Sequence, residues 1–165
     1  MRTYLIDGYN LGHKIPQVKQ FLNQRDFAAA IEMIIQVVQQ RLNTRKNRVI
    51  IVFDGKKGIF EQPSLATTIE IKFSRKPQEA DDVIRQLLRQ ANDTSDTVVI
   101  SSDRAIINSA KNLGAQSLTS EEFYSSKKQK RSGRTSMENN EKPDPDQVDL
   151  DYWLEQFRKN GDEDL

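Results

Sequence analysis

Three short apolar runs in this chain each end at an aspartate, and this pattern constrains the fold more than any other feature. The runs are YLID, VIIVFD and VVISSD, which end at Asp7, Asp54 and Asp103. If they form neighbouring parallel strands, their aspartates meet at the edge where open α/β sheets bind ligands. Converging carboxylates repel one another unless a divalent cation or a shared proton offsets the charge. The pattern therefore predicts a Mg²⁺ or Mn²⁺ site and chemistry on phosphate.

Strands and helices are expected to alternate along the chain. β-Branched or alternating runs predict strands at residues 3–6, 49–53, 67–73, 98–100 and 115–118. Helical spacing predicts helices at 27–42, 78–91 and 103–113, and a capping box of Thr119 and Glu122 begins another. Such alternation predicts an α/β fold with a mainly parallel, doubly wound sheet and helices on both faces.

Single residues predict how several of these elements begin and end. Asp26 is expected to cap the helix at 27–42, and Gly114 to end the helix at 103–113. Residues 7–10 are expected to form a turn, in which Gly8 lets the backbone approach a ligand closely. The run at 67–73 alternates between apolar and polar residues, so its strand is expected near an edge of the sheet.

Composition excludes several classes of site. The 165 residues contain no cysteine, which removes disulfides and thiolate-bound zinc. P-loop, Gly-x-Gly-x-x-Gly and Gly-x-Ser-x-Gly motifs are absent too. No leader and no long apolar stretch is visible, so a cytoplasmic protein without a membrane segment is expected. Lys and Arg gather in the runs 41–48, 56–57, 72–76 and 127–134, which suits a polyanion held by its backbone.

The chain is expected to divide into three parts. Residues 1–124 carry the alternating elements of one domain. Residues 125–147 are rich in Lys, Ser, Asn, Glu and Pro, and predict a flexible basic linker. Residues 148–165 predict a short amphipathic helix and an acidic tail. That helix is expected to bury one stripe against the domain itself or against a partner. The stripe consists of Leu150, Trp153, Leu154 and Phe157.

An acidic cluster at residues 79–82 opens the helix expected at 78–91, and helical geometry separates its members. At about 100° per residue, Asp81 lies at the border between the buried stripe and solvent. Asp82 lies almost opposite the stripe, and Glu79 lies on the other flank. Acids in a first helical turn also suit the helix dipole without any ligand. We expect Asp81 to be a catalytic metal ligand, with Asp82 and Glu79 supporting it.

The other acids have structural alternatives. Asp7 is the strongest candidate for catalysis and metal binding, because a buried run leads directly to it. Asp54 is followed by a lysine-rich loop, so a direct catalytic role and a supporting one both stay open. Asp103 is expected to bind the metal, and it can cap the following helix at the same time.

Polar and basic neighbours of these acids are candidates for binding the substrate. The candidates are Asn10, Ser102, Arg104, Lys56 and Lys57. The basic side chains can neutralise phosphate, and they can equally be exposed and unliganded. Tyr9 is expected either to stack on a base or to pack under the first loop.

Four spaced motifs together resemble the NYN domain, and more closely the bacterial YacP-like branch of the PIN-like nuclease superfamily. The motifs are LIDGYNL at 5–11, VFDG at 52–55, EADDVI at 79–84 and VISSDR at 99–104. The resemblance runs from residue 2 to about 124 and implies a PIN-like fold and metal-dependent cleavage of RNA. It implies that the acidic positions of the family are Asp7, Asp54, Asp81 and Asp103, with Asn10 and Ser102 as polar neighbours.

The acidic edge and the resemblance together predict a metal-dependent endoribonuclease that hydrolyses single-stranded RNA. The resemblance also implies products with 5′-phosphate and 3′-hydroxyl ends. Because the branch includes endoribonucleases that act on mRNA at the ribosome, it implies mRNA as substrate and the ribosome as a partner. Two alternatives stay open. One is an RNA- or ribosome-binding module with a weak or vestigial acidic site. The other is a phosphatase, although the Asp-x-Asp motif is missing after the first strand.

Overall fold

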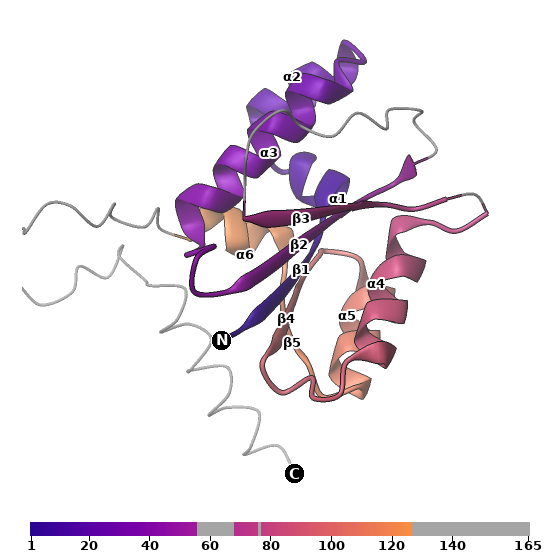
Figure 1. Cartoon of the computed structure of the whole chain (residues 1–165). Helices are drawn as coiled ribbons and strands as arrows, with labels where there is room; N and C mark the ends of the chain where they lie inside the picture. The colour runs from indigo at the N-terminus through magenta and orange to yellow at the C-terminus, as the bar shows by residue number, and fades with distance from the viewer. Residues whose placement is uncertain (56–67, 76, 127–165) are drawn as a thin grey trace, which may run out of the picture.

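A computed structural model of the 165-residue chain describes residues 1–55, 68–75 and 77–126 (Figure 1). Its centre is a five-stranded sheet in the order β3-β2-β1-β4-β5, in which all neighbouring strands are parallel. The strands are β1 (Thr3–Asp7), β2 (Arg48–Phe53), β3 (Ile69–Phe73), β4 (Thr97–Ile100) and β5 (Gln116–Leu118). The predicted parallel α/β sheet is confirmed.

The strand register brings the three predicted acidic turns to one edge of the sheet. β1 is central, with β2 and β4 as its two neighbours, so Asp7 lies beside Val52 and Ile6 lies beside Ile100. The chain therefore leaves β2 toward Asp54, and leaves β4 toward Asp103, at the same end of the sheet as Asp7. The alternating run is confirmed as the edge strand β3.

Helices cover both faces of the sheet, as predicted (Figure 1). One layer holds α1 (Gly8–Gly12), α2 (Pro16–Asn23), α3 (Phe27–Arg41) and α6 (Ser120–Ser125); the other holds α4 (Ala80–Gln90) and α5 (Arg104–Asn112). Tyr4 and Ile6 of β1 pack into the core of the first layer, and Leu5 packs into the second. Because side chains alternate along a strand, continuously apolar strands supply both cores.

The predicted signals at the helix ends are confirmed. The carboxylate of Asp26 accepts the N–H of Ala29 at 3.2 Å and caps α3. Gly114, with φ at +82°, follows the end of α5, where a left-handed residue closes the helix. Thr119 caps α6 and forms the expected box with Glu122. The capping residues and Gly114 therefore predict the ends of these helices to within a few residues.

The first crossover differs from the predictions in two ways. Residues 8–12 form the helix α1 directly after Asp7, where a turn was expected. Gly8 is required by packing, because a Cβ at that position would overlap the ring of Phe53, and its predicted approach to a ligand stays a prediction. The sequence analysis also assigns no element at α2, although Pro16 at its first position is a typical start of a helix.

Several predictions concern residues outside the described ranges. They include Lys56 and Lys57, the basic run at 127–134 and the stripe of Leu150, Trp153, Leu154 and Phe157. The division of the chain at residues 124 and 147 stays a prediction as well. Across the ranges that the structure describes, no helix combines the length and the apolarity that a membrane crossing needs.

Candidate functional site

Asp7 lies at the end of the central strand, and its carboxyl group is partly shielded from water. The hydroxyl of Ser101 donates to its Oδ2 at 3.4 Å, and the nearby N–H of Asn10 also favours the ionised form. Burial nevertheless raises the pKa of Asp7, with smaller contributions from the negative charges of Asp103 and Asp81, to about 6. The structure therefore brings Asp81 and Asp103 within electrostatic reach of Asp7.

Ser101, which the sequence analysis does not single out, connects Asp7 with Asp103. Its side chain is fully buried, and its Oγ accepts the backbone N–H of Asp103 at 3.1 Å while donating to Asp7. Asp103 in turn accepts the N–H of Ala105 at 2.8 Å and caps α5, as expected. The available signal was a hydroxyl that directly follows a buried run, since a buried polar group needs partners.

Asp81 and Asp82 have different partners in the first turn of α4. The Oδ2 of Asp82 accepts the backbone N–H of Glu79 at 2.9 Å, so this carboxylate belongs to the cap of the helix. Asp81 is paired with Arg85, whose Nη2 lies 3.6 Å from its Oδ2. The charge of Asp81 also acts on Asp7. Both side chains are partly buried, although helical spacing predicted that Asp82 would face water. Their partners distinguish them, and the ligand role of Asp81 stays a prediction.

Asp54 lies at the same end of the sheet among different neighbours. Its Oδ1 accepts the hydroxyl of Ser74 at 3.4 Å, and the same hydroxyl accepts the N–H of Gly55 at 3.1 Å. The charge of Asp54 adds to the effect of burial in raising the pKa of Tyr9 to about 12. The charges that raise the pKa of Asp7 come from other residues. Of its two predicted roles, the supporting one fits these contacts better.

Tyr9 packs in the core rather than presenting its ring to a base. It is 7% exposed, and its ring meets Phe53 at 5.0 Å and Phe27 at 6.2 Å between centroids, both edge to face. The packing alternative for Tyr9 therefore describes the structure, and a stacking role does not.

Asn10 and Ser102 are hydrogen-bonded within the protein. The Oδ1 of Asn10 accepts the N–H of Ser102 at 2.9 Å and the hydroxyl of Ser120 at 2.7 Å. The hydroxyl of Ser102 accepts the N–H of Ser120 and donates to Glu121, both at 3.0 Å. Lys14 completes the chain through an ion pair with Glu121 at 2.9 Å. These bonds hold the turn after β4 against α1 and α6, and the predicted contacts with substrate stay predictions.

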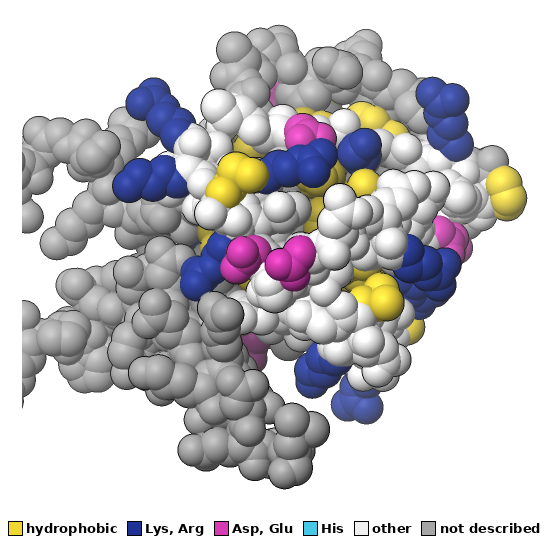
Figure 2. Space-filling view, turned by 60° about the horizontal axis from the view of Figure 1, so that its bottom comes forward, with side chains coloured by type: hydrophobic (Ala, Val, Ile, Leu, Met, Phe, Trp, Pro, Cys, Tyr) yellow, Lys and Arg dark blue, Asp and Glu magenta, His cyan; other side chains and the backbone are white. Residues whose placement is uncertain are grey.

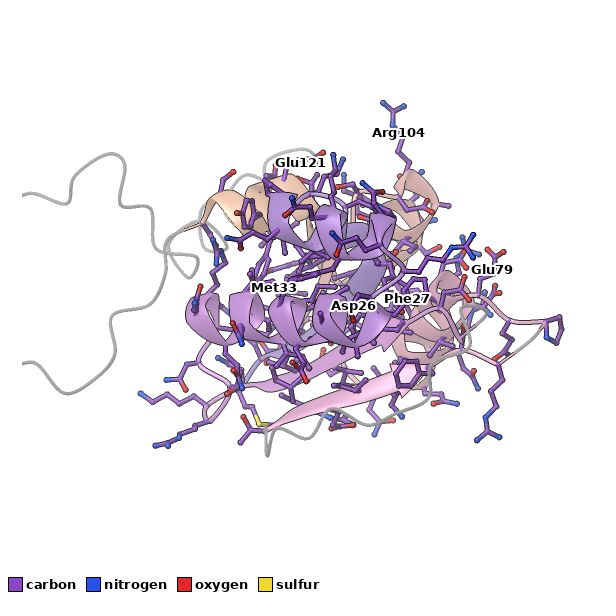
Figure 3. All side chains as sticks on the ribbon, turned by 90° about the horizontal axis from the view of Figure 1, so that it is seen from above. Asp26, Phe27, Met33, Glu79, Arg104 and Glu121 are labelled. Atoms are coloured by element: carbon purple, nitrogen blue, oxygen red, sulfur yellow. The ribbon has the colours of Figure 1, made fainter. Side chains whose placement is uncertain are left out.

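The basic candidates are not gathered around the acids in the described ranges. Arg104 is exposed and extends from the start of α5 away from the body of the domain (Figure 3). Figure 2 shows Lys and Arg side chains at several separate places on one face of the molecule. The guanidinium that does lie beside the acids belongs to Arg85, which the sequence analysis does not single out.

The three acids have the donor chemistry of a divalent-cation site without being assembled into one. Carboxylate oxygens are the ligands that Mg²⁺ and Mn²⁺ prefer. Within the described ranges, however, no group of three or more His, Cys, Asp or Glu side chains is close enough to hold a metal ion. Coordination of one ion by all three carboxylates would therefore require their side chains to move closer together.

Matches to known proteins cover between about half and nearly all of the chain. A family model described as the YacP-like NYN domain matches residues 4–160, beyond the limit near 124 that the motifs suggest. A curated relative, the uncharacterized protein YacP of Bacillus subtilis (strain 168), is 33% identical over 94 residues, which are 56% of this chain and 54% of that protein. The chain thus matches about half the length of this relative.

Solved structures of the same relative share the fold. A crystal structure of Rae1 (YacP) from Bacillus subtilis matches with a TM-score of 0.63 and 27% identity, over 74% of this chain and 71% of that chain. A mutant of Rae1 matches with a TM-score of 0.61 and 27% identity, over 74% and 72% of the two chains. The described sheet and helices therefore have the architecture of that protein.

Proposed function

The chain belongs to the family of YacP-like NYN domains, a nuclease-like family with a PIN-like α/β fold, and we propose that it is a metal-dependent endoribonuclease. Its reaction would be hydrolysis of phosphodiester bonds in single-stranded RNA. One observation carries the proposal most directly. A partly buried carboxyl group with a pKa of about 6 ends the central strand, and the charges of two further acids act on it. Such accumulation of carboxylates is costly unless a cation offsets it.

The proposal assigns different tasks to the residues of the edge. Asp7, Asp81 and Asp103 would hold one or two Mg²⁺ or Mn²⁺ ions. When bound, such ions supply a water of lowered pKa and offset the charge that develops on the leaving oxygen. Ser101 would keep the carboxylate of Asp7 and the backbone of Asp103 in fixed relation, because it hydrogen-bonds to both. Asp54 would support the edge through Ser74.

The proposed substrate is RNA, and its finer identity rests on the family. Membership of a nuclease-like family supports a nucleic-acid substrate. Messenger RNA as the physiological target and the ribosome as partner rest on the resemblance of the four motifs alone. The basic run at 127–134 is proposed to bind the phosphate backbone without regard to sequence.

One observation favours a second candidate function. The acids of the described ranges are not close enough to form a ready metal cluster. A protein that binds RNA or the ribosome through its surface, with a vestigial acidic edge, would have the same fold and the same acids in this arrangement.

Incubating the full chain with end-labelled single-stranded RNA, with Mn²⁺ or with EDTA, separates the two functions. The endoribonuclease cuts only with the metal, whereas the binding module retards the RNA on a gel and leaves it intact in both conditions. A small phosphomonoester in a parallel reaction should stay unhydrolysed. Its hydrolysis with intact RNA would instead identify a phosphatase.

A further inference from the structure

Arg85 carries a polar atom that the described part of the chain does not satisfy. Its Nε is buried and has no hydrogen-bond partner among the described residues, although 27% of the side chain is exposed. An unmade hydrogen bond at a buried charged group costs on the order of 1–3 kcal/mol or more. Buried polar groups in folded proteins are nearly always paired, so the Arg85 side chain would gain a missing hydrogen bond by moving its Nε to an acceptor that binds from outside.

The position of Arg85 places this free donor near the acidic edge. Side chains on a helix lean toward its N-terminus, so a residue in the second turn of α4 reaches back to the first turn. The contact with Asp81 confirms this direction, since Nη2 lies 3.6 Å from Oδ2. That distance suits an ion pair but exceeds a normal N–H···O hydrogen bond. The Nε and Nη2 atoms, which share one edge of the guanidinium, are therefore not saturated by Asp81.

The negative charge at the acidic edge explains why a phosphate that binds there would need a cationic donor such as Arg85. The negative charges of Asp81 and Asp103 act on Asp7 there, so an anionic substrate meets acidic side chains. Two other basic side chains have different surroundings, because Lys14 is paired with Glu121 and Arg104 extends away from the domain (Figure 3). A guanidinium edge with two parallel N–H donors matches the geometry of phosphate oxygens better than a lysine does.

We propose that Arg85 is a substrate-binding residue whose Nε and Nη2 donate to a non-bridging phosphate oxygen of the RNA backbone. The phosphate supplies the acceptor that Nε lacks. It also draws the guanidinium away from Asp81, which frees that carboxylate to turn toward Asp7. The inference rests on the proposed function in one respect only, that the ligand is RNA.

The test measures RNA binding without cleavage. The full-length chain carrying Asp7→Asn is titrated, in EDTA, into a short fluorescent single-stranded RNA at several KCl concentrations. Arg85→Gln is compared with Arg89→Gln, which removes the same charge from an exposed position one turn further along α4. We expect Arg85→Gln to weaken binding by about tenfold or more and to reduce the salt slope by about one. We expect Arg89→Gln to change the affinity by less than about twofold.

A second pair of variants protects the test against misfolding. Arg85→Lys keeps the charge and loses the paired donors, so it should retain the salt slope and bind about threefold or more weakly. Arg89→Lys should bind like the parent. Equal affinities and slopes for the Arg85 and Arg89 variants overturn the proposal. A melting temperature that falls in Arg85→Gln without any change in salt slope overturns it too, since that result assigns Arg85 to the fold alone.

Failure of the proposed function is a different result. If the wild-type chain leaves RNA intact with Mn²⁺ while binding still depends on Arg85, the phosphate contact stands and the nuclease proposal falls. If the wild-type chain cuts RNA and Arg85→Gln binds and cuts like Arg89→Gln, the phosphate contact falls alone.

Discussion

The ionised carboxylate of Asp7 lowers the free energy of unfolding, because burial and nearby negative charges disfavour it. Its pKa is about 6 in the folded chain, against 3.8 for an unperturbed aspartate. Between these two values the folded state binds more protons than the unfolded state, so stability decreases as the pH rises from about 4 to 6. The penalty is absent below pH 4 and fully present above pH 6. At about 1.4 kcal/mol per pH unit, it reaches about 3 kcal/mol at most.

We therefore expect Asp7→Asn to stabilise the metal-free protein at pH 7.5 by on the order of 1–3 kcal/mol, and to leave its stability at pH 4 nearly unchanged. The substitution is nearly isosteric and removes the charge that burial disfavours. Urea unfolding at the two pH values measures the difference. A loss of stability at pH 7.5 would show that the ionised carboxylate holds the fold together.

Asp81 and Asp82 form a natural matched pair, because they are adjacent and carry the same charge. Asp81→Asn should remove most cleavage activity with little effect on the melting temperature. Asp82→Asn should retain activity and lower stability by less than about 1 kcal/mol, because it weakens the charge at the N-terminus of α4. Single-turnover cleavage and thermal unfolding of both variants give the comparison. A larger loss of activity in the Asp82 variant would reverse the assignment.

At the scale of elements, the strands were predictable and the first crossover was not. β2 and β4 are continuously apolar because both of their faces are buried, and such a pattern is visible in the sequence. The helix α1 is five residues long, too short for a periodic signal, and it contains two glycines. It forms because tertiary packing of Tyr9 and Leu11 outweighs that poor propensity.

The same distinction applies to the site. Asp7, Asp54 and Asp103 were predictable because they follow apolar runs, whereas Asp81 and Asp82 differ in their partners and not in the exposure that helical spacing predicted. Ser101 and Arg85 were not singled out, because their roles depend on contacts between residues distant in sequence or on the burial of one atom. The hydrogen bonds that hold Asn10 and Ser102 were also beyond the sequence, since their partner Ser120 lies on α6.

Close packing of α1 on β2 depends on Gly8, and this gives a prediction at the same scale. Gly8→Ala should destabilise the protein by about 1–3 kcal/mol, because the added Cβ overlaps the Phe53 ring. It should also reduce activity, because Asp7 precedes Gly8 directly. Phe53→Leu in the same chain should recover part of the lost stability. Strictly additive effects of the two substitutions in urea unfolding would rule out this contact as the cause.

At the scale of the whole molecule, binding and cleavage should be separable. Replacing the four basic residues Lys127, Lys128, Lys130 and Arg131 with Ala should weaken RNA binding and flatten its salt dependence by up to about four charges. Cleavage of a short RNA at saturating concentration should survive, because these residues are not among the acids proposed to carry the chemistry. An unchanged salt slope in a filter-binding titration would mean that this run does not contact RNA.

The central claim is that the carboxyl edge of the sheet is a metal-dependent nuclease site built on Asp7. Its most direct test is the single-turnover rate of cleavage of end-labelled single-stranded RNA at pH 7.5. The rate is measured for the wild-type chain in Mn²⁺ and in EDTA, and for Asp7→Asn in Mn²⁺. Asp82→Asn serves as the control for loss of a nearby carboxylate. We predict cleavage by the wild-type chain and by Asp82→Asn in Mn²⁺, and none in EDTA or by Asp7→Asn. Equal rates with and without the metal, or an active Asp7→Asn variant, would contradict the claim.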